Sequence, residues 1–349
     1  MSSKLMKKDF TIVQNFPKLI LISLAIILAG VVFMFVTGLN IGIDYEGGAK
    51  IEIELAGDYA EDATFKSDFE KYFTDFINSS GYSVADKMQI SPLTEGGSTY
   101  EFRLAYELNG SKVSKTDEAQ AEFIQSLNGV NNDASKEGFR GTLEDEVKEY
   151  FERKDMADEY VEGCVKVAVI GATSSKSLLN ATFLAIALAL VAILVYIMIR
   201  FTVASGLAAI CGLAHDVLIM VALTAIFQIP VNTTFIAAVI TIIGYSINSS
   251  IVIFDKVREC KKSAAFGYAS NEEIANYSIK HSLVKVLLSV LTTLIMVVAL
   301  VLFSVSTIQE FILPIIFGLI AGTFSATCIN PSLWVIFEKI GAKAKSKKA

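Results

Sequence analysis

Long apolar segments are the feature that most constrains the fold of this chain. One run covers residues 19–38, and five more lie within residues 178–337, at about 178–199, 203–227, 232–254, 282–303 and 311–337. A helix needs about 20 apolar residues to cross the hydrocarbon core of a bilayer, and each run reaches that length. The chain is 53% hydrophobic and only 19% charged, which is too apolar for an ordinary soluble domain. The sequence therefore predicts an integral membrane protein with an all-α bundle of six transmembrane helices.

The first apolar run also has some features of a secretory signal peptide, because lysines precede it within residues 1–18. Its apolar part, Leu19–Val36, is longer than the roughly 7–15 residues usual for a signal-peptide core. No small-x-small cleavage site follows it. We therefore interpret this run as the first transmembrane helix.

Lysine and arginine near the span ends predict the orientation, because cytoplasmic loops are enriched in these residues. The basic segments are residues 1–18, the loop at Arg200, the loop Asp255–Lys262 and the tail 338–349. The short loops at 229–232 and 304–310 contain no Lys or Arg. All of these segments agree if both termini are cytoplasmic, which places residues 39–177 on the extracytoplasmic side.

The segment between the first two spans is strongly acidic. From Asp44 to Lys176 it carries 28 Asp and Glu against 14 Lys and Arg, whereas the rest of the chain carries 8 against 16. This acidity argues against a nucleic-acid partner. The four cysteines form no Cys-x-x-Cys pair, and only Cys164 lies in this segment, so neither a disulfide framework nor a metal site is expected. No Gly-rich phosphate loop is present, and we expect no cofactor and no bond-making catalysis.

Hydrophobic periodicity predicts a small α+β domain in this segment. Lys50–Leu55 and Ser98–Leu108 alternate polar and apolar residues as half-buried strands do, and Val165–Val169 reads as a closing strand. Helical spacing appears at 63–77, 119–127 and 143–151, with Phe65, Phe69, Phe73 and Phe76 as core candidates. The element order suggests a ferredoxin-like α+β sandwich. We interpret the polar stretch Gly110–Gly141 as a partly mobile insertion.

Asp216 is the clearest candidate for function in the predicted bundle. It lies about midway along the third apolar run, where a carboxyl group is costly unless it faces the bundle interior or water. Two interpretations remain open, an ion-coupling group or a hydrogen-bonded carboxyl that joins helices. His215 precedes it, but neighbouring residues on a helix point about 100° apart, so the two side chains need not share a face.

Other polar residues at membrane depth are weaker candidates. Asn248, Ser249 and Ser250 lie deep in the fourth run and either pack helices closely or line a hydrated path beside Asp216. Lys285 lies near the inner end of the fifth run and either joins that path or extends to the surface.

Four motifs resemble the SecF branch of the SecD/SecF family, part of the resistance–nodulation–division superfamily. Gly42-Ile43-Asp44-Tyr45-Glu46-Gly47-Gly48 is similar to the signature after the first span of SecD and SecF. Ala214-His215-Asp216-Val217-Leu218-Ile219 resembles the His-Asp motif of the third SecF span. The stretch from Thr241 through Gly244, Tyr245 and Asn248 to Asp255 and Arg258 resembles the fourth span and its inner loop, and Ser289–Leu294 resembles part of the fifth.

This resemblance implies a function in the bacterial cytoplasmic membrane. It implies a partnership with SecD beside the SecYEG channel, where a proton or sodium gradient helps to pull an exported unfolded polypeptide outward after SecA has pushed it. The chain departs from the family pattern at two positions. Ser249 stands where many relatives carry Asp, and Lys285 stands where many carry Arg. Asp216, His215, Asn248, Ser249, Ser250 and Lys285 are therefore the candidates for an ion pathway.

Two other functions remain open from the sequence. The chain resembles half of a transporter bundle, so a related transporter half-subunit for lipids or small molecules is one alternative. A membrane receptor with an outer sensor domain is the other. A receptor would not need Asp216 inside its bundle, and the inner segments are too short for a signalling domain.

Overall fold

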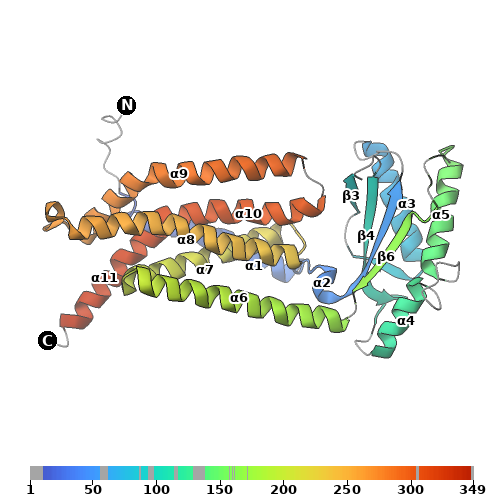
Figure 1. Cartoon of the computed structure of the whole chain (residues 1–349), viewed down its shortest axis with the longest axis horizontal. Helices are drawn as coiled ribbons and strands as arrows, with labels where there is room; N and C mark the ends of the chain where they lie inside the picture. The colour runs from blue at the N-terminus through green and yellow to red at the C-terminus, as the bar shows by residue number, and fades with distance from the viewer. Residues whose placement is uncertain are drawn as a thin grey trace. The chain divides into compact units, whose positions relative to one another are not determined.

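The computed structural model describes residues 11–55, 62–85, 88–92, 98–113, 117–128, 138–156, 158, 160, 162–170, 172–303 and 306–346. Parts of the N-terminal segment 1–18, of the insertion Gly110–Gly141 and of the tail 338–349 lie outside the described residues. The chain divides into two compact units. We call residues up to Asn40, Leu184–Phe303 and Glu310 onward the helical unit, and Ile41–Phe183 with Ser304–Gln309 the sheet unit (Figure 1).

The prediction of six apolar helices is confirmed. Within the described residues, six helices are long and apolar enough to cross a membrane. They are α1 Phe16–Val36, α6 Ala172–Arg200, α7 Val203–Ile226, α8 Thr233–Lys262, α9 Asn271–Phe303, and a last helix made of α10 Ser306–Phe324, the π-helical turn η5 Ser325–Ile329 and α11 Asn330–Ser346. A short 3-10 turn, η4 Ala264–Phe266, lies between α8 and α9. Helix α8 extends past its predicted apolar run at its C-terminal end and α9 at its N-terminal end, where the added residues are polar or charged.

Local sequence signals set the helix ends. The side chain of Thr202 accepts a hydrogen bond from the backbone N–H of Ser205, and that of Asn232 accepts one from Phe235 at 3.0 Å. Such N-caps satisfy backbone donors that the first helical turn leaves free. Gln228-Ile229-Pro230 separates α7 from α8 because proline cannot continue a helix and disfavours helical geometry before it.

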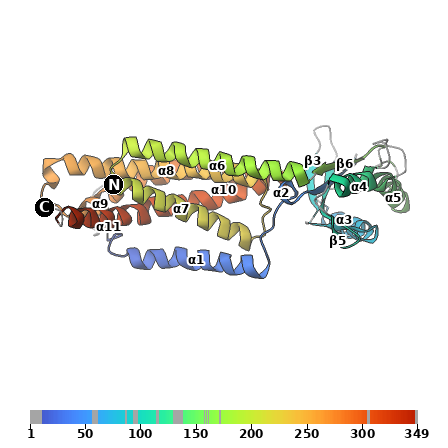
Figure 2. The same ribbon diagram turned by 90° about the horizontal axis from the view of Figure 1, so that it is seen from below.

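Helices α7, α8 and the last helix form the buried core of the helical unit. Helix α1 packs along α7, where a side chain on Gly30 would place its Cβ 2.3 Å from that of Ala222 (Figure 2). The apolar side chains of α1, α6 and α9 are largely exposed, for example Leu188 at 61% and Ile295 at 62%. Such a surface needs an apolar surrounding, which agrees with helices that lie in lipid.

The sheet unit is built on an antiparallel sheet. Its strands are β1 Gly48–Leu55, β2 Tyr82–Val84, β3 Gln89–Pro92, β4 Ser98–Leu108, β5 Ser111–Lys112 and β6 Val165–Ile170. The order is β2-β4-β1-β6, with β3 and β5 paired to β4. The helices are α2 Ile43–Glu46, α3 Ala63–Ser79, α4 Asp117–Asn128 and α5 Phe139–Arg153. The small antiparallel sheet confirms the α+β prediction for this segment.

The core of the sheet unit forms between one face of the sheet and helices α3, α4 and α5. Ile51 and Ile53 of β1 lie opposite Phe102 and Tyr100 of β4, and all four side chains are fully buried. Phe69 and Phe73 of α3 are also fully buried, with ring centroids 4.5 Å apart, whereas Phe65 and Phe76 pack at the edge. The predicted assignment of these phenylalanines to the core is therefore confirmed.

The Gly-Gly pair of the first motif has a steric explanation. Gly47 and Gly48 both have positive φ, 81° and 152°. A side chain on Gly48 would place its Cβ 2.2 Å from the carbonyl oxygen of Leu104, which precedes Ala105, the β4 partner of Gly48. Glycine alone tolerates both conditions. The pair therefore lets the turn α2, which contains Asp44 and follows Gly42, lead directly into β1.

Candidate functional site

Asp216 lies in the core of the helical unit and is almost completely buried, with 1% of its surface exposed. The hydroxyls of Ser246 on α8 and Ser325 in the turn η5 both donate hydrogen bonds to Oδ2, the second at 2.8 Å. Nδ1 of His215 lies 2.9 Å from Oδ1. The carboxyl group thus joins three helices, and both of its oxygens have partners.

His215 belongs to this site, although helix geometry alone did not require it. Its side chain is 11% exposed and contacts that of Asp216, although the two residues lie about 100° apart around α7. Nε2 of His215 is buried and has no hydrogen-bond partner among the described residues. Imidazole can donate or accept at either nitrogen, so His215 offers a second titratable group in contact with the carboxyl.

A second polar layer lies one helical turn away from Asp216. The side-chain amide of Asn330 on α11 donates a 2.7 Å hydrogen bond to the hydroxyl of Ser250 on α8. On α7, Gly212 leaves room for this amide, because a Cβ there would lie 2.0 Å from Oδ1 of Asn330. That amide oxygen has no partner among the described residues. The two layers form a continuous polar strip inside an otherwise apolar core.

The π-helical turn η5 brings Ser325 to the carboxyl group. Pro331 follows it closely, and proline has no N–H to bond the carbonyl of residue 327 and crowds that carbonyl. The hydroxyl of Thr327 bonds back to the carbonyl of Thr323 at 2.7 Å, which further competes with the regular ladder. The helix widens there into a π-turn, a feature common at functional sites.

Of the other sequence candidates, Ser250 lies in the second polar layer, whereas Ser249, Asn248 and Lys285 are not bonded to Asp216. Ser249 is buried, but its hydroxyl is not among the groups bonded to the carboxyl. Asn248 is exposed on the outer side of α8, because it lies two residues from the buried Ser246 and therefore about 200° around the helix. Lys285 is exposed on α9. Neither side chain is bonded to Asp216 in this structure, and a place for Asn248 or Lys285 in an ion pathway stays a prediction.

Other motif residues of the helical unit make contacts away from Asp216. The hydroxyl of Tyr245 donates to the backbone carbonyl of Ser289 at 2.7 Å and so ties α8 to α9. Asp255, near the end of α8, accepts a 2.8 Å contact from Arg200 and a 3.3 Å contact from Arg258. Gly244 lies on the exposed side of α8 with open space beside it. Among the described residues, no group of three His, Cys, Asp or Glu side chains is placed to hold a metal ion.

Comparison with known proteins identifies the family. The model of the family "protein export membrane protein SecD/SecF, C-terminal" matches residues 152–340, more than half of the chain. The chain belongs to the SecD/SecF family. The match covers α7, α8, the turn η5 and the start of α11, which hold the whole Asp216 site, and it confirms the resemblance noted in the sequence.

Individual SecD/SecF relatives agree with this assignment. The protein translocase subunit SecDF of Bacillus subtilis is 31% identical over 95% of this chain and 38% of its own length. SecF of Rickettsia bellii is 38% identical over 49% of this chain and 56% of its own length. SecF of Petrotoga mobilis is 29% identical over 95% of this chain and 96% of its own length. The chain thus spans about 38–56% of the first two relatives and nearly the whole of the third.

The fold is similar to that of a solved SecDF structure. The crystal structure of SecDF from Thermus thermophilus superposes with a TM-score of 0.67 at 22% identity, over 95% of this chain and 39% of that chain. A second SecDF crystal structure gives a TM-score of 0.59 over 98% of this chain. With six apolar helices, the SecD/SecF chain is a multi-pass protein of the bacterial membrane.

Sequence reasoning missed two members of the Asp216 site. Ser325 and Asn330 both lie in the last apolar run, where a polar residue at membrane depth is itself a signal. That signal does not single them out, because Thr323, Thr327 and Ser332 lie in the same run. Ser246 lies in the small-residue stretch of the fourth run, but the sequence pattern favoured its neighbours at 248–250 as candidates.

Proposed function

We propose that the chain is a SecF-type subunit that uses an ion gradient to assist the export of unfolded polypeptides across the bacterial cytoplasmic membrane. The observation that carries the proposal is the buried carboxyl of Asp216, which is bonded to groups from α8 and η5. Ionisable side chains inside a membrane bundle are costly and mark ion pathways or proton relays by default. The subunit works without bond-making catalysis and without a cofactor.

The site suits a group that takes up and releases an ion as helices move. Oδ2 accepts from both Ser246 and Ser325, so a proton on Oδ2 breaks or reverses at least one of these bonds. A proton on Oδ1 reorganises the contact with His215. Either change alters how α8 and the last helix are held to α7. Carboxylate and hydroxyl oxygens are also ligands for hard cations such as sodium. The secretion test therefore includes both a proton gradient and a sodium gradient.

The serine at position 249 makes Asp216 more important for ion coupling in this subunit. A serine hydroxyl does not ionise at physiological pH, so Ser249 cannot carry the charge that an aspartate at this position could carry. His215 is then the second titratable side chain in direct contact with the site. We therefore assign ion coupling in this subunit to Asp216, with His215 as its partner.

A SecD-type partner fits against an exposed polar stripe of α8 and α9. Asn248 and Gly244 on α8 and Lys285 and Ser289 on α9 are exposed although they lie in apolar helices. Polar groups facing lipid alone are costly, and small residues permit close helix packing. Replacement Asn248→Leu should reduce co-purification with the SecD-type subunit. The matched change Leu218→Ala, on the exposed side of α7, should not.

The orientation and the wider assembly belong to the same proposal. Both termini are cytoplasmic, residues 39–177 form the extracytoplasmic domain, and the assembly works beside SecYEG after SecA has acted. In a cysteine-free chain, single cysteines within Gly110–Gly141 should react from outside intact cells. Cysteines placed at Lys261 or Lys345 should not, and external labelling of the latter would contradict this topology.

We also assign the sheet unit to the ferredoxin-like type. Counting β1, β2, β4 and β6 as the four main strands, their antiparallel order β2-β4-β1-β6 is the 2-3-1-4 order of a split β-α-β arrangement. Helix α3 connects β1 to β2, and α4 and α5 connect β4 to β6. Strands β3 and β5 are additions along β4.

Export measured in cells depleted of their own SecF tests the function directly. The chain, supplied with its SecD-type partner, should restore secretion of a presecretory protein. Collapse of the coupled proton or sodium gradient should remove this gain. A chain that restores the level of SecD but leaves secretion unchanged would contradict the proposal and favour a transporter half for other cargo.

A further inference from the structure

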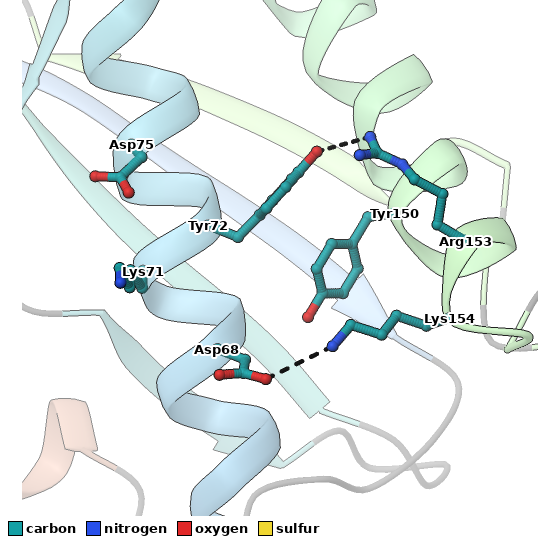
Figure 3. A pocket seen from close by; sticks show the side chains of 7 residues that line it. All are labelled: Asp68, Lys71, Tyr72, Asp75, Tyr150, Arg153 and Lys154. Atoms are coloured by element: carbon teal, nitrogen blue, oxygen red, sulfur yellow. Dashed lines mark hydrogen bonds and ion pairs between the residues drawn. The ribbon is translucent and has the colours of Figure 1, made fainter.

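The sheet unit contains a groove of its own. It runs between α3 and the end of α5 and encloses a cavity of about 340 Å³ (Figure 3). Asp68, Tyr72 and Asp75 line it from α3, and Tyr150, Arg153 and Lys154 line it from α5 and its C-cap. The volume lies at the lower end of the range of ligand pockets, which suits one side chain with its adjoining backbone. We call it the α3–α5 groove.

Tyr150 gives the groove an unsatisfied polar group. Its side chain is buried, with 4% of its surface exposed, and its hydroxyl has no hydrogen-bond partner among the described residues. The hydroxyl points to the side of the groove where Asp68 and Lys154 lie (Figure 3). Burial raises the pKa of Tyr150, and the nearby charge of Asp68 adds to it, so the group remains a neutral donor and acceptor. A buried hydroxyl without a partner is costly. Because this oxygen is closed to solvent, a guest reaches it only where a side chain of the groove moves aside.

Lys154 already occupies a cation position in the groove. Its Nζ lies 5.8 Å from the centre of the Tyr150 ring and 3.6 Å from Oδ2 of Asp68. An aromatic face beside a carboxylate is a favourable site for a cation. The side chains of Lys154 and Asp68 are 49% and 59% exposed, so their ion pair is weak and easily exchanged.

Arg153 is not available to a guest anion. Its Nη2 donates to the hydroxyl of Tyr72 at 2.7 Å and to Glu146 at 2.7 Å, and it lies 3.5 Å from Glu149. Tyr72 also donates to Glu146. The charge of Arg153 is therefore met by carboxylates of the same helix. The groove carboxylates that can attract a guest are Asp75 and, once it is released from Lys154, Asp68. Lys71 on α3 opposes them in part.

The charge of the surrounding segment points to the same kind of guest. With 28 acidic and 14 basic residues between Asp44 and Lys176, the segment attracts basic ligands over long range. An extended polypeptide that carries lysine or arginine offers both a cation for the groove and backbone groups for the Tyr150 hydroxyl.

We infer that the α3–α5 groove binds a lysine or arginine side chain of an unfolded polypeptide. The guest cation takes the place of Lys154 against Tyr150 and Asp68, and a polar group of the guest pairs with the Tyr150 hydroxyl. This inference rests on the proposed function, because it supplies a contact site for the exported chain.

The test uses the full chain in detergent and two fluorescent, unstructured peptides. One peptide carries three arginines spaced by Gly-Ser, and the other carries glutamine at the same positions. Fluorescence anisotropy at low salt should show tighter binding of the arginine peptide. Asp68→Asn should weaken it about two- to fivefold, the range expected for an exposed ion pair. Asp145→Asn, an exposed change of equal charge elsewhere on α5, should not reproduce that loss.

The direction of the change in affinity after Lys154→Gln decides whether Lys154 competes with the guest. If Lys154 competes with the guest, its removal should tighten binding of the arginine peptide about two- to fivefold. Lys148→Gln changes the net charge equally at an exposed site of α5 and corrects for the long-range effect. Tyr150→Phe, which keeps the ring, should weaken binding. Equal binding of both peptides, or weaker binding after Lys154→Gln than after Lys148→Gln, would overturn the inference.

Secretion in SecF-depleted cells separates the inference from the proposed function. If the wild-type chain restores secretion while Asp68→Asn and Lys154→Gln change neither secretion nor peptide binding, the groove inference fails and the function stands. If the peptide results hold but the chain never restores secretion, the proposed function fails and the groove remains a binding site for basic segments.

Discussion

Replacement of Asp216 by asparagine tests ion coupling while keeping the packing. Asparagine has nearly the same size, and its Oδ1 can accept from Ser246 and Ser325 as Oδ2 of Asp216 does. Its amide can donate to Nδ1 of His215, which then carries its proton on Nε2. Every contact of the site therefore has a neutral counterpart, but the side chain can no longer take up or release a proton.

The expected cost in stability follows from the three hydrogen bonds. Bonds to a charged group contribute about 1.5–3 kcal/mol and neutral ones about 0.5–1.5 kcal/mol, so each contact loses about 1–1.5 kcal/mol. The total loss over the three contacts is about 3–4.5 kcal/mol. It is offset in part because a buried charge no longer has to be desolvated. Asp216→Ala should cost more, because it leaves the hydroxyls of Ser246 and Ser325 without their acceptor and opens a cavity.

Secretion and stability measured together check this reasoning. Asp216→Asn should keep normal abundance and binding to the SecD-type partner but lose the secretion that depends on the gradient. Ser250→Ala serves as the matched control, since it removes a buried hydroxyl one turn away that cannot ionise. It should lower stability by about 1–3 kcal/mol, because the amide of Asn330 loses its acceptor, and leave gradient-dependent secretion in place.

Two results would refute the assignment. Full gradient-dependent secretion with Asp216→Asn, at matched protein levels, would show that the carboxyl joins helices and that the coupling acid lies in the partner subunit. Equal loss with Ser250→Ala would show that secretion responds to packing of the core rather than to a titratable group.

Three further predictions follow from the packing. Gly212→Ala should destabilise the chain by about 1–3 kcal/mol, because the added Cβ collides with Asn330, whereas Gly244→Ala, with open space beside it, should leave the isolated chain unchanged in thermal unfolding. Burial, with the charge of Glu144, raises the pKa of Cys164 to about 12; thiolate reagents should therefore fail to label it at pH 7–9, and labelling should rise only as the pH approaches 12 or on unfolding. Pro331→Ala restores a backbone N–H and should convert η5 toward regular α-helix, lowering gradient-dependent secretion without loss of abundance, whereas unchanged secretion would show that the π-turn is dispensable.

The helices and the central carboxyl were predictable from the sequence because their signals are local. Twenty apolar residues in a row have few structures open to them, and an acid such as Asp216 in the middle of such a run has few tolerable surroundings. The core phenylalanines of α3 were predictable for the same reason, since Phe69 and Phe73 repeat at helical spacing on one face.

The partners of Asp216 were not predictable in the same way. Which side of α8 faces α7 depends on how both helices pack, and a rotation of 100° per residue decides between Ser246 and Asn248. The contribution of Ser325 depends on the π-turn before Pro331, which shifts the register of the last helix. These facts involve two or three helices at once, so a pattern along one helix does not contain them.

The energies at the Asp216 site are of the size that coupling requires. Moving one charge through a membrane potential releases about 2.3 kcal/mol per 100 mV. One charge-assisted hydrogen bond contributes about 1.5–3 kcal/mol. The energy available from moving one proton is therefore similar to the energy of a hydrogen bond from Ser246 or Ser325 to Oδ2, and these bonds hold α8 and η5 against α7. A fully exposed carboxyl would not have this property, because water would replace any bond it lost. A carboxyl locked by many ion pairs would not yield to one proton. A buried acid held by two hydroxyls and an imidazole lies between these limits, which is where one proton can change the arrangement of helices.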